Sequence, residues 1–212
     1  MVYTRAVVYT TLLIACFSVA AMPQGPTGGL IITDSATLKR GEFQFGPLEV
    51  RTEKLESKLM GREMPFRVIL PAGYADAANS TKRYPVIYLL HGLTGNFANW
   101  TERTDITEAA RWTDAIIVTP EGENGWYTDS VTKPEDRHES YIVKELIPDI
   151  DKRYRTKAER KSRAIAGLSM GGYGALKFGL KYPEMFSLAG SFSGALGAAT
   201  FPALGRSDAS LN

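Results

Sequence analysis

The chain has 212 residues, of which 44% are hydrophobic and 23% charged. This length suits one domain with appendages, and this composition excludes a disordered or fibrous protein. The 25 Lys and Arg residues nearly balance the 23 Asp and Glu residues and are interspersed with them. This charge pattern gives no indication of a nucleic-acid partner. A single cysteine, Cys16, excludes an internal disulfide framework and a cysteine-based zinc site.

The first 21 residues have the pattern of a secretory signal peptide. A short basic start ending at Arg5 precedes an apolar run over residues 6–20, and small residues follow where a signal peptidase would cut. The run is too short for a comfortable membrane span. We expect removal of residues 1–21 and a secreted or periplasmic protein. The alternative is a lipoprotein anchored through Cys16, because the preceding residues resemble a bacterial lipobox.

The mature part begins with a predicted linker and continues as one domain. Residues 22–47 form the linker or N-terminal extension, which opens with Gly, Pro and small polar residues, and residues 48–212 form the domain. Loose alternation over 49–58, followed by the segment 66–70 (FRVIL) after Gly61 and Pro65, predicts a first antiparallel pair of strands.

Strands and helices are then expected to alternate. Two apolar runs, at residues 86–90 and 115–118, predict buried strands, and the segments 163–166 and 187–192 predict a third and a fourth strand. Helical spacing predicts helices at residues 104–112, 138–154 and 170–182, the second kinked by Pro148. Such alternation predicts an α/β fold with a mostly parallel sheet and helices on both faces.

The segment Gly167–Gly171 (GLSMG) matches the nucleophile pattern G-x-S-x-G. A short apolar strand leads into it, and a helix rich in small residues leads out. The chemistry requires both flanks, because a tight strand-to-helix turn lifts the hydroxyl of Ser169 above the sheet at a helix N-terminus. We therefore predict that Ser169 is a catalytic nucleophile.

A second segment, residues 89–95 (LLHGLTG), follows the first buried strand. A tetrahedral intermediate of acyl transfer needs two N–H donors for its oxyanion. We expect one from Met170, directly after the nucleophile, and the other from Leu93 in this loop. His91 is expected to orient the loop from below rather than to carry protons.

At this point the chain resembles the Putative esterase family of α/β-hydrolases, which includes esterase D (S-formylglutathione hydrolase), the antigen 85 mycolyltransferases, and feruloyl and acetyl-xylan esterases. The resemblance runs from about residue 48 to 197. It rests on the segments 84–92 (YPVIYLLHG), 120–127 (PEGENGWY), 139–141 with 145–148, and 166–175 (AGLSMGGYGA).

The resemblance implies acyl transfer from a small-molecule or carbohydrate ester, or a thioester, to water, or less often to a sugar hydroxyl. It implies no metal and no cofactor. It also places Trp126 and Tyr127 as candidate walls of the acyl pocket, with His91 in the same substrate-binding region. The alternative for the two aromatic residues is ordinary packing.

The family's acid and histidine are missing from this chain. The fold orders its triad as Ser, then Asp or Glu, then His, but Ser169 is followed only by the acids Glu184 and Asp208 and by no histidine. We expect an α/β-hydrolase domain that lacks its last strands, with the base and acid beyond residue 212. A base from His91 or His138 would need a chain order unlike this fold's. Two other functions stay open: an acyltransferase resembling antigen 85, and a non-catalytic carbohydrate- or surface-binding protein on a degenerate hydrolase fold.

Overall fold

The structure, a computed structural model, describes residues 48–199. The predicted signal peptide and linker, with Cys16, and the chain from residue 200 onward lie outside the described residues. Across the part that the structure describes, no helix is both long and apolar enough to cross a membrane.

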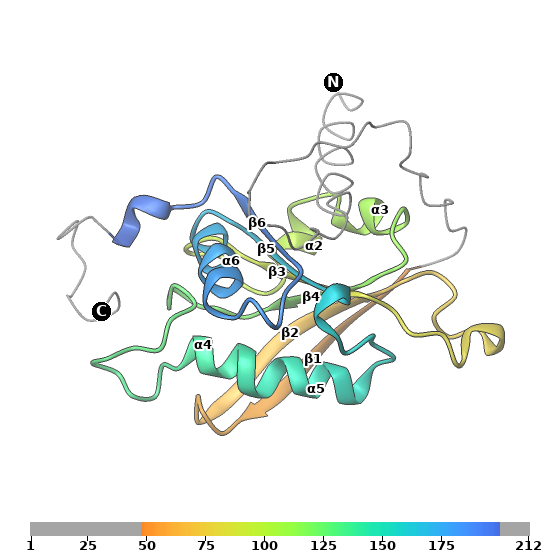
Figure 1. The fold of residues 1–212 in the computed structure, drawn as a ribbon, viewed down its shortest axis with the longest axis horizontal. Coiled ribbons are helices and arrows are strands. Elements are labelled where there is room, and N and C mark those ends of the chain that lie inside the picture. The colour runs from red at the N-terminus through yellow and green to blue at the C-terminus, as the bar shows by residue number, and fades with distance from the viewer. Residues whose placement is uncertain (1–47, 200–212) are drawn as a thin grey trace, which may run out of the picture.

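A six-stranded sheet forms the centre of the molecule (Figure 1), in the order β1-β2-β4-β3-β5-β6. The strands are β1(Glu49–Ser57), β2(Arg62–Leu70), β3(Val86–Leu90), β4(Ile116–Pro120), β5(Arg163–Leu168) and β6(Leu188–Phe192). The hairpin β1–β2 is antiparallel, and β2 also pairs antiparallel with β4. The remaining strands pair in parallel. These pairings confirm the predicted mostly parallel sheet with an antiparallel start.

The longer helical segments are α2(Asn99–Glu102), α3(Ile106–Ala110), α4(His138–Tyr141), the π-helical turn η3(Ile142–Leu146), α5(Ile147–Arg153) and α6(Met170–Lys181). Short 3-10 turns lie at η2(Ala77–Asn79), η4(Arg160–Ser162) and η5(Leu196–Ala199). The helix expected over 104–112 is the shorter α3, and the sequence did not indicate α2. At the start of α3, the Thr104 hydroxyl accepts the N–H of Ile106 at 3.2 Å.

Helical structure runs without a break from α4 through η3 into α5. Inside an ordinary α-helix, a proline lacks one N–H donor, and its ring clashes with the carbonyl four residues earlier. Pro148 stands at the start of α5, directly after the π turn, whose hydrogen bonds span five residues instead of four. The irregularity expected at Pro148 is thus a local change of helix type.

Both faces of the sheet are covered, as predicted. Val86, Tyr88 and Leu90 of β3 belong to a core that also contains residues of α5 and α6, and Ile87 and Leu89 belong to a second core that includes α3. All five β3 residues are buried. Since successive side chains of a strand point to opposite faces, β3 needs cover on both sides, and α3 and α5 lie on opposite sides of the sheet in Figure 1.

This architecture brings three loops to one edge. The segments that follow β3, β4 and β5 begin at His91, Glu121 and Ser169, at the carboxyl ends of neighbouring parallel strands. In open α/β sheets this edge is where ligands bind.

Candidate active site

Ser169 occupies a strained turn between β5 and α6. Its φ is 55° and its ψ is −115°, a region that L-residues rarely adopt. The backbone on both sides is fixed: the Ser169 N–H donates to the carbonyl of Phe192 at 2.9 Å, and the Ser169 carbonyl accepts the N–H of Ala195 at 3.1 Å. The end of β6 therefore holds the turn that carries the hydroxyl.

The glycines of the motif are required by close backbone approach. A Cβ on Gly167 would lie 2.3 Å from the backbone of Gly171, and a Cβ on Gly171 would lie 2.3 Å from the carbonyl oxygen of Leu90. Helix α6 thus packs directly against β5 and β3 at its first turn. Larger side chains at either position would push the helix away from the sheet and move Ser169.

The segments that carry the two expected oxyanion donors adjoin Ser169. Gly92 is next to the nucleophile, since a Cβ on Gly92 would lie 3.5 Å from the Cβ of Ser169. Leu93 follows Gly92 in the loop, and Met170 is the first residue of α6. The first N–H groups of a helix have no acceptor within it and carry the positive end of the helix dipole. The site can therefore stabilise negative charge that develops beside Ser169.

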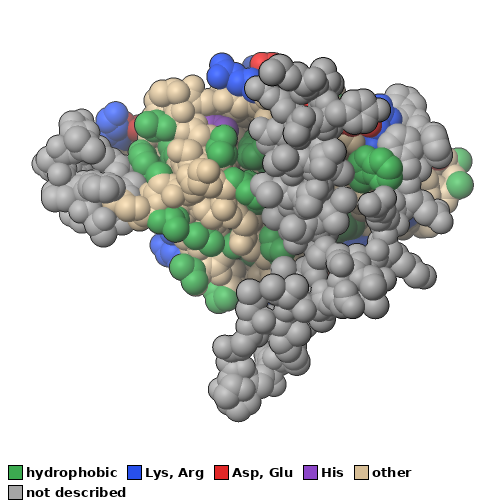
Figure 2. All heavy atoms as spheres, turned by 90° about the horizontal axis from the view of Figure 1, so that it is seen from above, with side chains coloured by type: hydrophobic (Ala, Val, Ile, Leu, Met, Phe, Trp, Pro, Cys, Tyr) green, Lys and Arg blue, Asp and Glu red, His purple; other side chains and the backbone are tan. Residues whose placement is uncertain are grey.

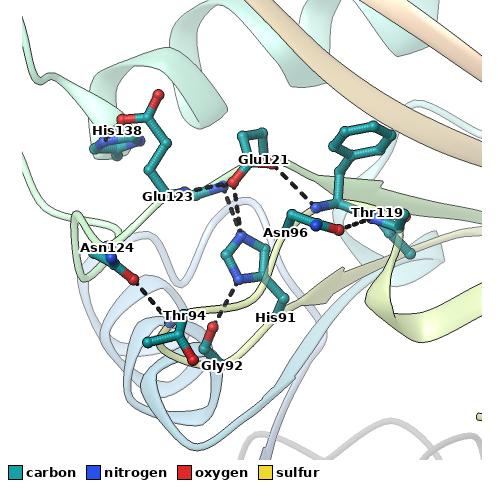
Figure 3. A network of polar contacts seen from close by, with 12 residues as sticks. His91, Gly92, Thr94, Asn96, Thr119, Glu121, Glu123, Asn124 and His138 are labelled. Carbon is teal, nitrogen blue, oxygen red and sulfur yellow. Dashed lines mark hydrogen bonds and ion pairs between the residues drawn. The ribbon is translucent and has the colours of Figure 1, made fainter. Parts of the chain in front are cut away.

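His91 is buried beneath the loop that it begins, with 2% of its surface exposed. Its Nδ1 lies 2.8 Å from the carbonyl oxygen of Gly92. Its Nε2 lies 2.9 Å from the backbone nitrogen of Gly122 and 3.1 Å from Oε1 of Glu121. Both ring nitrogens are therefore engaged in joining the loops that follow β3 and β4 (Figure 3).

Glu121 is the centre of this network. Besides contacting His91, its carboxylate accepts the N–H of Glu123 at 2.6 Å and the N–H of Phe97 at 3.2 Å. Burial alone would raise the pKa of the Glu121 carboxyl, but the hydrogen bonds from His91 and from these N–H groups outweigh burial and lower it. Glu121 therefore stays ionised and joins the loop that follows β3 to its own loop after β4.

A further contact fixes the loop beyond Leu93. The side-chain oxygen of Asn124 accepts the N–H of Thr94 at 2.8 Å (Figure 3). Sequence reasoning assigned neither Asn124 nor Glu121. A signal existed for Glu121, because it directly follows β4 as His91 directly follows β3, and these two parallel strands end side by side.

The two candidate wall residues differ in exposure. Trp126 is half-buried and meets Tyr173 of α6 edge-on, with ring centroids 5.8 Å apart. Tyr127 has no exposed surface, and its hydroxyl donates to the carbonyl oxygen of His91 at 3.0 Å. Of the pair, only Trp126 has surface with which to contact a substrate.

Glu123, Asp136 and His138 place three possible metal-ligand atoms within 4.8 Å of one another. Arg62, however, already pairs with Glu123 at 2.9 Å and with Asp136 at 3.0 Å. A metal ion would have to displace this guanidinium. His138 is buried, its Nε2 lies 3.6 Å from Glu123, and burial lowers its pKa.

Comparison with known proteins finds esterases. A family model described as Putative esterase matches residues 57–205. An esterase of Mycobacterium tuberculosis is 36% identical over 146 residues, which cover 66% of this chain and 31% of that protein. An endo-1,4-beta-xylanase/feruloyl esterase of Xylanibacter ruminicola is 34% identical over 148 residues, which cover 65% of this chain and 20% of that protein.

Solved structures show the same likeness. A ferulic acid esterase matches with a TM-score of 0.67 and 32% identity, covering 78% of this chain and 64% of that one. An S-formylglutathione hydrolase from Staphylococcus aureus matches with a TM-score of 0.64 at 22% identity, covering 74% of this chain and 63% of that one, and supports the fold alone. The chain spans less than two thirds of the length of each of these proteins. With its sheet, its strained serine turn and a family match over most of its length, the chain belongs to the Putative esterase family and has the α/β-hydrolase fold.

Proposed function

We propose that this chain is a serine esterase that hydrolyses a carboxylic ester or thioester through an acyl-enzyme on Ser169. The observation that carries the proposal is the backbone of Ser169, which stands at positive φ between β5 and the first residue of α6, with Gly92 beside it. Membership of an esterase family makes ester hydrolysis the expected reaction.

The proposed reaction follows from the positions of these groups. The hydroxyl oxygen of Ser169 attacks the ester carbonyl and loses its proton to a base, and the carbonyl oxygen becomes an oxyanion. The N–H groups of Met170 and Leu93 then donate to that oxyanion. Each such donor contributes about 3 kcal/mol of transition-state stabilisation. Collapse expels the alcohol or thiol, which takes up the proton, and water then releases the acid from Ser169.

Neither histidine is arranged as the base of this serine. Both nitrogens of His91 are engaged beneath the loop, and Nε2 of His138 faces Glu123. The prediction that the base and acid follow residue 212 stays a prediction. The full rate requires this base and acid, because an oxyanion hole and substrate binding alone leave only a residual rate above that in water.

The surface around Ser169 favours an acyl group with apolar character. Leu93, Leu168 and Leu196 are 46%, 46% and 53% exposed, and each lies in one of the segments that adjoin the nucleophile. In the view from above, hydrophobic side chains are spread over the described surface (Figure 2). The names of two relatives, a feruloyl esterase and a ferulic acid esterase, fit an acyl group of this kind.

We also propose that the protein acts outside the cytoplasm. The basic and apolar pattern of residues 1–21 supports export, and an extracellular ester fits a carbohydrate-linked or other small-molecule substrate.

Labelling with a fluorophosphonate tests the proposed nucleophile. In a chain extended to the full length of the family, intact-mass analysis should show one adduct on the unmodified protein and none on Ser169→Ala. Ser193→Ala is the matched control, because Ser193 also has a positive φ, of 47°, at the end of the neighbouring strand. Equal labelling of Ser169→Ala and the unmodified protein would remove Ser169 as the nucleophile.

A further inference from the structure

A series of buried polar contacts connects α4 to the loop that carries Leu93. Lys177 of α6 donates to the carboxylate of Glu139 at 2.7 Å and to the carbonyl oxygen of Tyr127 at 2.5 Å. The Tyr127 hydroxyl in turn donates to the carbonyl oxygen of His91 at 3.0 Å. Tyr127 therefore links an ion pair in the core to the first peptide of the loop beside Ser169.

The backbone at Tyr127 is held in a conformation that it would not adopt alone. Trp126 and Tyr127 have φ values of 54° and 56°, and bulky residues are rare in this left-handed region. Such strain persists only where the surroundings over-determine it, and it is concentrated at functional sites. The hydrogen bond from Lys177 to the carbonyl of Tyr127 fixes the strained peptide directly.

Two glycines, Gly122 and Gly174, lie against the ring of Tyr127. A Cβ on Gly122 would lie 2.3 Å from the Tyr127 ring, and a Cβ on Gly174 would lie 2.7 Å from it. The Tyr127 ring thus packs between the loop that follows β4 and helix α6, with no space on either side for a shift.

The carboxylate of Glu139, which pairs with Lys177, has further hydrogen-bond donors. Glu139 also accepts from Lys181 at 2.6 Å and from the Tyr182 hydroxyl at 2.6 Å. Burial lowers the pKa of Lys177, although Glu139 opposes that effect. A buried ion pair adds little net stability to a fold, because desolvation offsets the attraction. Its contribution here is to place an ammonium group on the backbone of Tyr127.

The atom that Tyr127 contacts bears directly on the catalytic geometry. The carbonyl oxygen of His91 lies 2.7 Å from where a Cβ of Gly171 would be, so this peptide packs against the first turn of α6. The loop continues from there into Gly92 and Leu93. We propose that Tyr127, clamped by Lys177 and Glu139, is a positioning residue that holds the oxyanion loop at the correct distance from Ser169. The role of this loop as an oxyanion donor rests on the proposed function.

The variant Tyr127→Phe tests the inference by removing only the hydroxyl. Tyr141→Phe is its matched control, because the Tyr141 hydroxyl is also buried but has no hydrogen-bond partner among the described residues. Amide hydrogen exchange of residues 90–96 should become about tenfold faster in Tyr127→Phe, as expected for the loss of one hydrogen bond that closes a local opening. Lys177→Met should act in the same direction. Exchange as slow in Tyr127→Phe as in Tyr141→Phe would overturn the proposal.

A second measurement separates positioning from general stability. Saturation kinetics of fluorophosphonate labelling should show a limiting rate about tenfold lower in Tyr127→Phe, with unchanged half-saturation, because the loop acts on the developing charge. An unchanged limiting rate with a higher half-saturating concentration would contradict the proposal. If the unmodified protein is not labelled on Ser169, the proposed function fails, while the exchange experiment still decides whether Tyr127 holds the loop.

Discussion

Replacing Gly171 with alanine tests whether close packing of α6 on the sheet positions the nucleophile. The added methyl would lie 2.3 Å from the carbonyl oxygen of Leu90, 2.6 Å from its carbonyl carbon and 2.7 Å from the carbonyl oxygen of His91. All three are backbone atoms at the end of a central strand, so no side-chain rotation relieves the contact. Overpacking of this kind costs about 1–3 kcal/mol, and we place this case at the upper end.

Alanine is also a better helix former than glycine, and this offsets about 1 kcal/mol of that cost. The net loss is then about 2 kcal/mol. For a domain of this size, that loss lowers the melting temperature by about 4–8 °C. Because the helix must move away from β3, Ser169 moves relative to Gly92, and labelling by a fluorophosphonate should slow as well.

Gly92→Ala provides the contrasting case. Its methyl would lie 3.4 Å from the carbonyl oxygen of Leu168 and 3.5 Å from the Cβ of Ser169, which are ordinary contact distances. The fold should tolerate it with little change in melting temperature, although the methyl would crowd the reacting hydroxyl. Thermal unfolding followed by circular dichroism measures the difference between the two variants. Equal melting temperatures for Gly171→Ala and Gly92→Ala would refute the argument from backbone contact.

Three further predictions concern pH, export and the isolated chain. Burial would raise the pKa of the Glu139 carboxyl, but hydrogen bonds from two lysines and a tyrosine lower it from 4.5 to about 2. Its contribution to the free energy of unfolding is therefore present above about pH 5 and is lost as the pH falls toward 2. In urea titrations, the free energy of unfolding of Glu139→Gln should fall less steeply between pH 5 and pH 2 than that of the unmodified protein. An equally steep fall would contradict this. N-terminal sequencing of exported protein should begin at Ala21 or Met22, whereas a lipid on Cys16 would show a membrane-anchored lipoprotein instead. Residues 22–212 alone should be nearly inactive on p-nitrophenyl acetate, because no histidine follows Ser169 in them to act as the base. They should also associate in size-exclusion chromatography, because β6 has one strand neighbour within the described residues. A cooperatively melting, active monomer whose activity is lost in His138→Ala would show that both halves of this expectation are wrong.

The central strands could be predicted because their composition leaves no polar face. Val86–Leu90 is apolar at every position, and all five residues are buried, so only a site between two helical layers accommodates them. The start of β2 was not predicted. The segment predicted from the sequence begins at Phe66, yet Pro65 already lies inside the strand opposite Lys54, where its carbonyl accepts the N–H of Glu121 at 3.1 Å.

The contiguous parts of the site could also be predicted, whereas the parts that depend on distant contacts could not. The motif around Ser169 and the loop around Leu93 each form a local pattern with known chemistry. Tyr127 contacts residues 36 and 50 positions away, at His91 and Lys177. No local sequence pattern relates these positions. From the sequence, Trp126 and Tyr127 were therefore equivalent candidates for the wall of the acyl pocket.

Backbone strain gives a separate reason to place the function at this edge of the sheet. Within residues 48–199, the residues other than glycine with positive φ are Thr94, Glu123, Trp126, Tyr127, Ser169 and Ser193. Each follows the carboxyl end of β3, β4, β5 or β6, which are the four parallel strands. Strained residues cost about 1–3 kcal/mol each and persist where the surroundings fix them. Strain distributed by chance would also occur in the loops at the opposite edge, where the positive φ found among the described residues belongs to a glycine, Gly73. The backbone alone therefore singles out the edge that carries Ser169, independently of the G-x-S-x-G pattern.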